Sequence, residues 1–564
     1  MHDDAILLLP MPRQIQRRPG TSRANPQFTI DPKLAPSRGY RITLTPDHCQ
    51  IIAADPAAQF YAQQTLTQLH RQFGDSLPCL EIEDSPDFPV RGVLLDISRD
   101  KVPTMDTLLS IVDWLSELKI NQLQLYTEHT FAYIGHEIVW RDATPMTPEE
   151  IRRLDAHCKE RFIDLVPNQN SLGHMERWLR HPKYLPLAEA AGGADSPWGF
   201  RWQGPFSLCP TDPASLELIA DLYAQLLPNF SSPLFNVGCD EAFDIGQGRS
   251  RDACQKHGVG TVYLQYLQKI SDLAAAHGRR IQFWADGILQ HPELIPKIPP
   301  GAIALAWGYE ADHPFEKDCR SFSNAGIPFY VAPGTSSWCS IAGRTDNMLA
   351  NQIAAAETGL RHGAVGFLNT DWGDFGHLQY WPASFPGLAA GAAMSWCLQT
   401  NRQIPLPAVL DLHVFQDHCG IMGKLACDLG NVYQAVGKLI PNRSALFNIL
   451  VPTSARKNPM EGITCERLET ARYAVESGIQ SLDRAKMNRL DADLIRAEFT
   501  NAAAMLKHAC RKGCWKLGAG DTAKSLAAEM HHIIQSHRDC WLARNRPGGL
   551  PDSMDRLADI FDHD

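Results

Sequence analysis

The stretch FNVGCDEAF, residues 235–243, gives the strongest indication of how this chain folds. A short apolar run up to Val237 predicts a buried strand, which breaks at Gly238 and is followed by two adjacent carboxylates, Asp240 and Glu241. Two charges are costly to desolvate, so they must be held by specific hydrogen bonds or face a functional surface. The structural alternative is a strand end whose acids only cap the next helix or face water.

Length and composition describe a protein with a sizeable core and no strong charge preference. The chain has 564 residues, 44% of them hydrophobic, and a formal net charge of −10. We therefore expect neither nucleic acid nor a membrane as a partner. The acidic N-terminus and the short apolar piece at residues 5–10 predict neither a signal peptide nor a membrane span.

The cysteines indicate a reducing compartment. All 15 are scattered without a CxxC pair or a regular spacing, which favours free thiols in the cytoplasm over a disulfide framework. The chain also lacks the His and Cys spacings of metal sites, so we expect no metal and no cofactor.

Short apolar runs alternate with amphipathic stretches between residues 89 and 400. The expected strands are residues 90–96, 122–126, 162–167, 234–237, 281–284, 302–307, 328–331 and 365–369. This alternation predicts an α/β fold in which a parallel sheet closes into a (β/α)₈ TIM barrel. An open doubly wound sheet is the alternative, but it usually brings a Gly-rich phosphate loop, and none follows a strand here.

Two further units flank the predicted barrel. Residues 1–88 indicate a small α+β domain with strands at 40–44 and 50–52, a helix at 57–73 and an acidic linker at 83–89. Residues 401–564 predict a helical domain without strands, with long helices at 464–486 and 491–511. Its apolar faces should pack on the barrel, and packing on another copy in a homo-oligomer is left open.

Polar and aromatic residues collect just after the predicted strands. Because all eight βα loops of a barrel converge on one face, these side chains should share one rim. The expected rim residues are Arg99, Glu128, His129, Asn168, His174, Asp240, Glu241, Trp284, Asp286, Trp307, Trp338, Asp371, Trp372 and Asp374. Tryptophans stack on sugar rings, while acids and arginine bind hydroxyls, so the rim predicts a carbohydrate site.

The adjacent acids suit one kind of glycoside cleavage better than another. Neighbouring residues at one strand end point in different directions, so Asp240 and Glu241 cannot flank a glycosidic bond as an opposed pair. A neighbouring pair suits a scheme in which one acid protonates the leaving oxygen and the other steers a nucleophile carried by the substrate.

Four segments resemble motifs of family 20 glycoside hydrolases, the β-N-acetylhexosaminidases. Residues 235–243 are similar to the fourth-strand motif, RGVLLDISR at 91–99 to the first strand, LGH at 172–174 to the third-strand loop, and TDWGD at 370–374 to the eighth-strand motif. The resemblance spans residues 90–395 and is closest to the intracellular hexosaminidase D-like branch. It implies an exo-acting enzyme that removes terminal β-linked GlcNAc or GalNAc from a glycan.

The resemblance implies a role for each matching residue. Glu241 would be the general acid and then the base. Asp240 would hold the 2-acetamido group, whose oxygen attacks the anomeric carbon to give an oxazolinium intermediate with net retention. The other implied contacts are Arg91 to O3 and O4, Asp374 to O4 and O6, Trp372 under the ring, Trp284, Trp307 and Trp338 around the acetamido methyl, Tyr330 to the acetamido oxygen, and His174 behind Glu241.

The chain departs from the family pattern at three places. Cys239 replaces a glycine and is expected to face the helix layer. Glu128 and His129 replace paired aspartates, which leaves open which of them supports His174. Asp374 replaces a glutamate, which bears on the choice between GlcNAc and GalNAc or on a 6-substituted sugar. A barrel glycosidase for 6-sulfated GlcNAc and a non-catalytic carbohydrate-binding barrel therefore remain as alternatives, and a metal-dependent barrel hydrolase is disfavoured.

Overall fold

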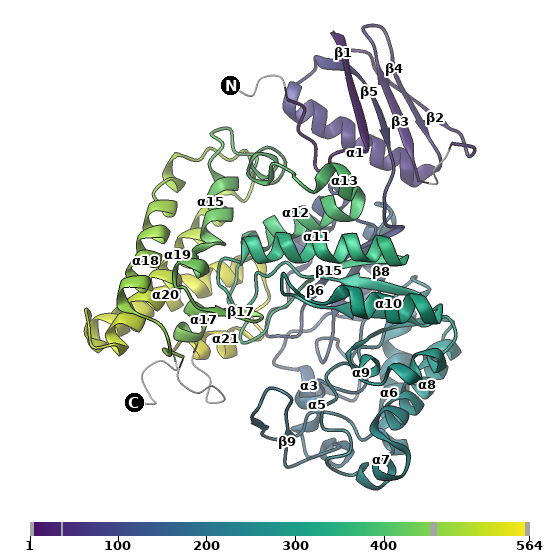
Figure 1. The fold of residues 1–564 in the computed structure, drawn as a ribbon, viewed down its shortest axis with the longest axis vertical. Coiled ribbons are helices and arrows are strands. Elements are labelled where there is room, and N and C mark those ends of the chain that lie inside the picture. Colours follow the sequence, from purple (N-terminus) through teal and green to yellow (C-terminus); the bar gives the residue numbers. More distant parts are fainter. Residues whose placement is uncertain (1–4, 35–37, 452–458, 559–564) are drawn as a thin grey trace.

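The computed structural model describes residues 5–34, 38–451 and 459–558. A small N-terminal sheet unit, a central barrel and a set of C-terminal helices follow one another along the chain (Figure 1). The C-terminal helices lie along one flank of the barrel, and the N-terminal unit lies at one end of it.

The barrel strands pair in parallel in the order β11-β12-β13-β14-β15-β6-β7-β8. A parallel bridge between Asn168 and Asn236 joins the two outer strands and closes the ring. All eight predicted strands are confirmed, and the alternative of an open sheet is wrong. The strands are β6 (Val90–Asp96), β7 (Gln122–Tyr126), β8 (Asp164–Val166), β11 (Leu234–Asn236), β12 (Arg280–Trp284), β13 (Ile303–Trp307), β14 (Phe329–Ala332) and β15 (Gly366–Asp371).

Amphipathic helices between the strands cover the barrel. Their apolar faces carry buried residues such as Leu108 and Leu115 in the first of them, against polar outer faces. The principal helices are α2 (Met105–Glu117), α4 (Pro148–Lys159), α6 (Pro213–Leu226), α8 (Val259–Ala276), α10 (Phe315–Ala325), α11 (Thr345–His362) and α12 (Trp381–Trp396).

A buried amide cluster fills part of the barrel interior. Gln124 donates to Gln282 over 2.7 Å, and Asn236 donates to Gln124 over 2.8 Å. These side chains come from three different strands and bond to one another, which offsets part of the cost of burying polar groups. The cluster helps to hold β7, β11 and β12 in register.

The N-terminal unit is a five-stranded sheet in the order β1-β5-β3-β4-β2 with α1 (Pro56–Phe73) packed on it. Its strands are β1 (Gln14–Ser22), β2 (Pro26–Ile30), β3 (Tyr40–Leu44), β4 (Cys49–Ala53) and β5 (Leu77–Asp84). The expectation of a linker from residue 83 is wrong in its first part, since β5 includes Asp84. That carboxylate is buried, forms an ion pair with Lys119 over 3.2 Å and accepts from Trp396 over 2.8 Å.

The C-terminal region is mostly helical, with two differences from expectation. A short hairpin joins β16 (Leu439–Ile440) to β17 (Arg443–Ser444), so the region does contain strands. The first long helix, α18, ends at Ile479 rather than at residue 486. The other helices are α13 (Leu398–Asn401), α14 (Leu406–Val409), α15 (Met422–Leu429), α16 (Val432–Ala435), α17 (Ala445–Leu450), α19 (Ala492–Lys516), α20 (Ala523–Arg544) and α21 (Leu550–Ala558).

This region contacts the loops that follow several barrel strands. Asp552 pairs with Arg177 over 3.0 Å, and Arg546 donates to the Pro145 carbonyl over 2.7 Å. The backbone N–H of Asn442, in the β16–β17 hairpin, donates to Glu310 over 2.6 Å. Among the described helices, none combines the length and the apolar character that a bilayer crossing requires.

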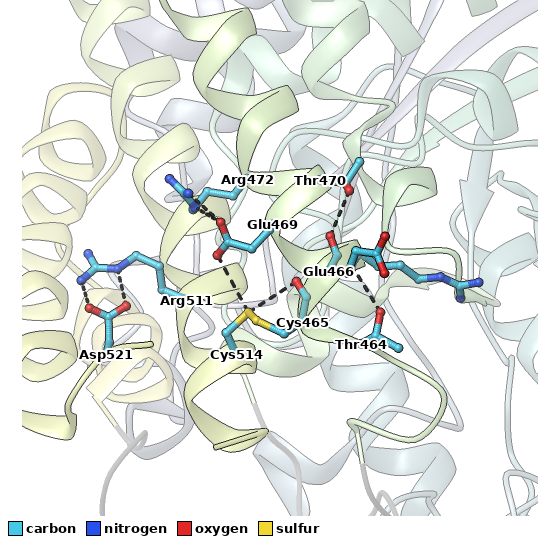
Figure 2. Close-up of a disulfide and its surroundings, with 10 residues drawn as sticks. Thr464, Cys465, Glu466, Glu469, Thr470, Arg472, Arg511, Cys514 and Asp521 are labelled. Carbon is cyan, nitrogen blue, oxygen red and sulfur yellow. Dashed lines mark hydrogen bonds and ion pairs between the residues drawn. A yellow bond between two sulfur atoms is a disulfide. The ribbon is translucent and has the colours of Figure 1, made fainter. Parts of the chain in front are cut away.

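One cysteine pair differs from the expectation of free thiols. Cys465 and Cys514 form a disulfide between α18 and α19 (Figure 2). Beside it, Glu469 accepts two hydrogen bonds from Arg472, at 3.0 and 2.6 Å. The remaining 13 cysteines lie outside a disulfide, and all but Cys419 are buried, so most of them act as small core residues.

Candidate active site

The two acids stand on a strained turn after β11. Gly238, Cys239 and Glu241 have φ angles of 66°, 66° and 49°, a backbone region that costs a non-glycine residue about 1–3 kcal/mol. A Cβ at Gly238 would lie 1.6 Å from the Asn170 side chain, so only glycine fits there. Strain of this kind persists only where the surrounding structure enforces it, which is common at functional sites.

Cys239 faces the helix layer, as expected. Its carbonyl accepts a hydrogen bond from Tyr263 of α8 over 3.1 Å, and its thiol is 1% exposed. Burial raises the pKa of this thiol well above its ordinary value. A neutral, buried thiol takes no direct part at the rim, so the difference from the family glycine is a matter of packing.

His174 connects the two acids. Its Nε2 lies 3.2 Å from Asp240 Oδ2 and 3.4 Å from Glu241 Oε2. Burial alone would lower the pKa of His174, but the two acids outweigh it and hold that pKa well above the ordinary value. The imidazole therefore favours its charged form next to the pair.

The loop that carries His174 fits tightly against the turn that carries the acids. A Cβ at Gly173 would lie 2.2 Å from the backbone oxygen of Asp240. Such a distance is far below any contact that a real Cβ makes, so a side chain at residue 173 would push the two loops apart. The glycine thus sets the separation between the histidine and the acids.

Asp286 holds the backbone of Glu241 by a hydrogen bond. It follows β12, accepts from the Glu241 N–H over 2.8 Å and accepts from Trp307 Nε1 over 3.3 Å. Burial, reinforced by the nearby Asp240 charge, raises the pKa of Asp286 to about 7. This carboxyl therefore gains or loses its proton near neutral pH.

Arg99, after β6, lies among three carboxylates. Its guanidinium is 3.1 Å from Asp96, 3.2 Å from Glu128 and 3.8 Å from Asp374. It also lies over the rings of Tyr126 and Trp372, 4.5 and 5.1 Å from their centroids. A planar guanidinium held in this way keeps donors available for hydroxyls, which is the arrangement expected of a sugar-binding arginine.

Neither residue after the second strand bonds directly to His174. Among the described residues, the Nδ1 of that histidine has Arg99 Nη2 as its neighbour, at 3.4 Å. Burial raises the pKa of Glu128 to about 7, and Glu128 contacts Arg99 rather than the histidine. His129 is buried, and burial lowers its pKa well below the ordinary value. Any support from Glu128 therefore reaches His174 through the attraction of charges or through Arg99, rather than through a direct hydrogen bond.

Aromatic side chains form one wall of the site. Trp372 lies edge-on to Tyr126 with centroids 4.8 Å apart, and 5.7 Å from Trp284. Its indole N–H donates to Tyr309 Oη over 2.8 Å. Trp307 stacks on Tyr309 with centroids 5.3 Å apart. Trp338 meets the Tyr309 ring edge-on at 5.0 Å and donates to Asn442; like Trp284, it is 1% exposed.

Asp374 follows Trp372 by two residues and lies 3.8 Å from Arg99, with its side chain 27% exposed. Burial raises its pKa, partly offset by the nearby charges of Arg99 and Arg443. Arg443 comes from β17 and lies over the Phe375 ring at 4.7 Å. Two guanidinium groups thus influence Asp374, although the sequence around it contains no cluster of basic residues.

Two of the expected site residues lie elsewhere. Arg91 is fully buried at the start of β6, where it donates to the Lys119 and Phe88 carbonyls over 2.9 and 3.0 Å. Tyr330 is also buried, and burial within the barrel raises the pKa of its hydroxyl to about 12. Both expectations are wrong because these residues occupy strand interiors or strand starts, away from the rim where the acids lie.

Three residues of the cluster had no assigned role in the sequence reasoning. Arg99 and Asp286 had been placed on the rim but given no function, and strand direction alone would have favoured Arg99 over Arg91. Tyr309 was missed, although it follows Trp307 by two positions and therefore lies on the same side of the extended chain.

Comparison with known proteins matches two segments of the chain to domains of the same family. The chain matches Glycosyl hydrolase family 20, domain 2, over residues 11–85, and Glycosyl hydrolase family 20, catalytic domain, over residues 136–347. β-Hexosaminidase from Akkermansia muciniphila is 25% identical over 300 residues, which cover 48% of this chain and 58% of that protein. Human hexosaminidase D is 24% identical over 338 residues, which cover 56% of this chain and 66% of that protein.

The chain thus spans less than two thirds of the length of these two relatives. Among solved structures, Flavobacterium johnsoniae chitobiase superposes with a TM-score of 0.59 at 14% identity, covering 95% of this chain and 99% of that one. At this identity the likeness establishes the fold alone. Because residues 11–85 and 136–347 match two domains of one family, the chain belongs to glycosyl hydrolase family 20.

Proposed function

We propose that this protein is an exo-β-N-acetylhexosaminidase that removes terminal β-linked GlcNAc or GalNAc with retention of configuration. One observation carries the proposal: Asp240 and Glu241 meet His174 at 3.2 and 3.4 Å on the rim that also carries the tryptophan wall. A neighbouring acid pair next to aromatic rings suits a substrate that supplies its own nucleophile.

In the proposed first step, Asp240 accepts the acetamido N–H and orients its carbonyl oxygen toward the anomeric carbon. That oxygen forms a bond to C1 as the glycosidic C–O bond breaks, and Glu241 gives its proton to the leaving oxygen. The product is an oxazolinium ion. In the second step Glu241 takes a proton from water, whose oxygen attacks C1. The bond between C1 and the acetamido oxygen breaks, which restores the acetamido group and gives net retention.

The rest of the site binds the sugar. Arg99, rather than Arg91, donates to O3 and O4, and Asp374 accepts from O4 and O6. Trp372 lies under the ring, and Trp284 and Trp307 enclose the acetamido methyl. The Tyr309 hydroxyl takes the role first expected of Tyr330 and donates to the acetamido oxygen, since it already lies 2.8 Å from the Trp372 indole nitrogen.

The proposal is tested with aryl β-glycosides of GlcNAc, GalNAc and glucose. We expect the two N-acetylated sugars to be cleaved and the glucoside to be nearly inert, because it lacks the internal nucleophile. Glu241→Gln should lower turnover about 10²- to 10⁴-fold, the usual contribution of general acid catalysis. Comparable cleavage of the glucoside would contradict substrate assistance, and an inactive wild-type enzyme that still binds GlcNAc would favour a non-catalytic binding barrel.

A second candidate substrate is a GlcNAc with an anionic group at O6, such as a sulfate. Arg443 is only 8% exposed, and among the described residues no carboxylate lies within ion-pairing distance of it. Its charge and that of Arg99 both act on Asp374, the residue proposed to face O6. Adding aryl 6-sulfo-GlcNAc to the substrate panel decides between the two sugars.

We also propose that the enzyme works in the cytoplasm on small glycans. The 13 cysteines outside a disulfide support a reducing compartment, whereas the Cys465–Cys514 disulfide is of a kind more usual in an oxidising one.

A further inference from the structure

A row of aromatic rings runs from the catalytic acids to the protein surface. We call it the aromatic strip, and it consists of Phe206, Phe243, Trp202, Phe200 and Trp198. The Phe206 ring lies 4.9 Å from the His174 ring, 4.7 Å from Phe243 and 5.1 Å from Trp202. Trp198 lies 5.3 Å from Phe243 and stacks on Phe200 at 6.0 Å.

Most of the strip is displayed by a small hairpin, β9 (Ala194–Asp195) and β10 (Arg201–Trp202). The hairpin lies at the opposite end of the molecule from the N-terminal sheet (Figure 1). Gln247 exchanges two hydrogen bonds with the Asp195 backbone, both at 2.9 Å, which ties the hairpin to the loop that follows the acids. These bonds hold the hairpin, and with it most of the strip, in a fixed position.

Exposure increases along the strip. Phe206 is 2% exposed next to His174, whereas Trp198, at the hairpin tip, is 48% exposed. A large aromatic ring held in water by a short turn loses the benefit of burial, and such surfaces commonly bind ligands. The flat faces of tryptophan are well suited to the CH-rich face of a pyranose.

The strip adjoins the proposed general acid rather than the tryptophans of the wall. The Phe243 N–H donates to the Glu241 carbonyl over 2.6 Å, so the strip begins in the same turn as the proposed general acid. Among the described residues, none of its rings contacts Trp284, Trp307 or Trp372, which enclose the sugar to be removed. A general acid faces the leaving oxygen, so the group attached to that oxygen extends toward the strip.

We infer that the aromatic strip binds a neutral sugar of a β-linked oligosaccharide on the leaving side of the scissile bond, with Trp198 as the outermost stacking ring. The inference rests on the proposed function. Arg201, which lies on the hairpin itself, is paired with Asp195 at 3.2 Å. The strip therefore offers stacking to an uncharged ring rather than a site for an anion.

The test compares two substrates with the same sugar to be removed. One is the β-1,4-linked GlcNAc disaccharide, and the other is methyl β-N-acetylglucosaminide, whose leaving group has no ring. Trp198→Ala should lower kcat/KM about 3- to 10-fold for the disaccharide and less than about twofold for the methyl glycoside. Trp198→Phe should recover part of the loss, because it keeps a ring.

Tyr473→Ala is the matched control, since Tyr473 is also an exposed aromatic residue, at 64%, but lies on α18. It should leave both substrates unaffected. Equal losses on the two substrates, or no loss on either, would overturn the inference.

A binding measurement separates this inference from the proposed function. In the Glu241→Gln background, Trp198→Ala should weaken calorimetric binding of the disaccharide by the same 3- to 10-fold, about what one stacked ring contributes, and should not weaken binding of free GlcNAc. Unchanged disaccharide affinity rejects the strip even if the enzyme hydrolyses N-acetylglucosaminides. A wild-type enzyme that releases no GlcNAc, together with weakened disaccharide binding, rejects the hydrolase and keeps the strip.

Discussion

Strand β6 carries an arginine at each end, and the two have opposite surroundings. Arg91 begins the strand among uncharged partners: backbone carbonyls and the rings of Tyr61 and Trp396, at 5.2 and 4.9 Å. Arg99 follows the strand among carboxylates. Burial lowers the pKa of Arg91, whereas at Arg99 neighbouring acids outweigh burial and raise the pKa well above its ordinary value.

The difference shows how one barrel separates stability from chemistry. At the Arg91 end, hydrogen bonds and ring contacts join the N-terminal sheet to the barrel, and the Lys119–Asp84 ion pair belongs to the same interface. At the Arg99 end, positive φ angles and close acids oppose folding but hold groups that a sugar can use. The TIM-barrel rule that chemistry lies at the carboxyl ends of the strands applies within a single strand.

The largest effect on this comparison should come from Arg99→Ala. We expect kcat/KM for an aryl N-acetylglucosaminide to fall about 10²- to 10³-fold, as for loss of a donor aimed at the transition state. Arg99→Lys should recover only part, because lysine cannot form the same planar fork. A loss below about threefold, with the fold intact by circular dichroism, would remove Arg99 from the site.

Arg91→Ala should act on stability instead. Its loss leaves the buried Lys119 and Phe88 carbonyls without their donor, and we expect the free energy of unfolding to fall by about 2–4 kcal/mol. Urea unfolding measures this change. Activity per folded molecule should stay near that of the wild type, and a selective loss of kcat would return Arg91 to the catalytic end.

The pH dependence of stability should give the smallest effect. The pKa of Asp286 is raised to about 7, so the folded state binds a proton that the unfolded state releases near pH 4. The contribution of this group to the free energy of unfolding is fully present below about pH 4 and is lost as the pH rises through about 7. Asp286→Asn does not titrate, so it should gain on the order of 1–3 kcal/mol relative to the wild type between about pH 4 and pH 8.

Urea unfolding at the two pH values measures this gain, with the exposed Asp312→Asn as the control. A constant difference between Asp286→Asn and the wild type across the range would show that Asp286 does not take up the proton.

The barrel could be predicted because its signal is local. Each strand is a short apolar run and each helix has its own amphipathic period, so the eight strands could be identified one at a time. The positions of Asp240, Glu241, His174 and Trp372 followed from strand direction. Strand direction also places Arg99, and not Arg91, at the carboxyl end of β6. The error at Arg91 came from assigning a role within the RGVLLDISR motif without using that direction.

The remaining differences involve residues far apart in the sequence. Arg443 reaches the neighbourhood of Asp374 from a hairpin in the C-terminal region, and no local pattern marks that approach. The Cys465–Cys514 disulfide likewise joins two helices across 49 residues, which spacing alone could not indicate. Tyr330 was misplaced because a strand tyrosine can face either the barrel interior or the rim, and the sequence period does not say how far along the strand it lies.

The contacts between the C-terminal helices and the rim loops limit how this enzyme can be dissected. Asp552, Arg546 and Asn442 each hold a loop that follows a barrel strand, and Arg443 adds its charge beside Asp374. A chain ended after α12 would keep every barrel strand yet lose all four of these supports. The smallest fragment that keeps the candidate site intact is therefore longer than the barrel itself, because the helical region supports the loops that form the site.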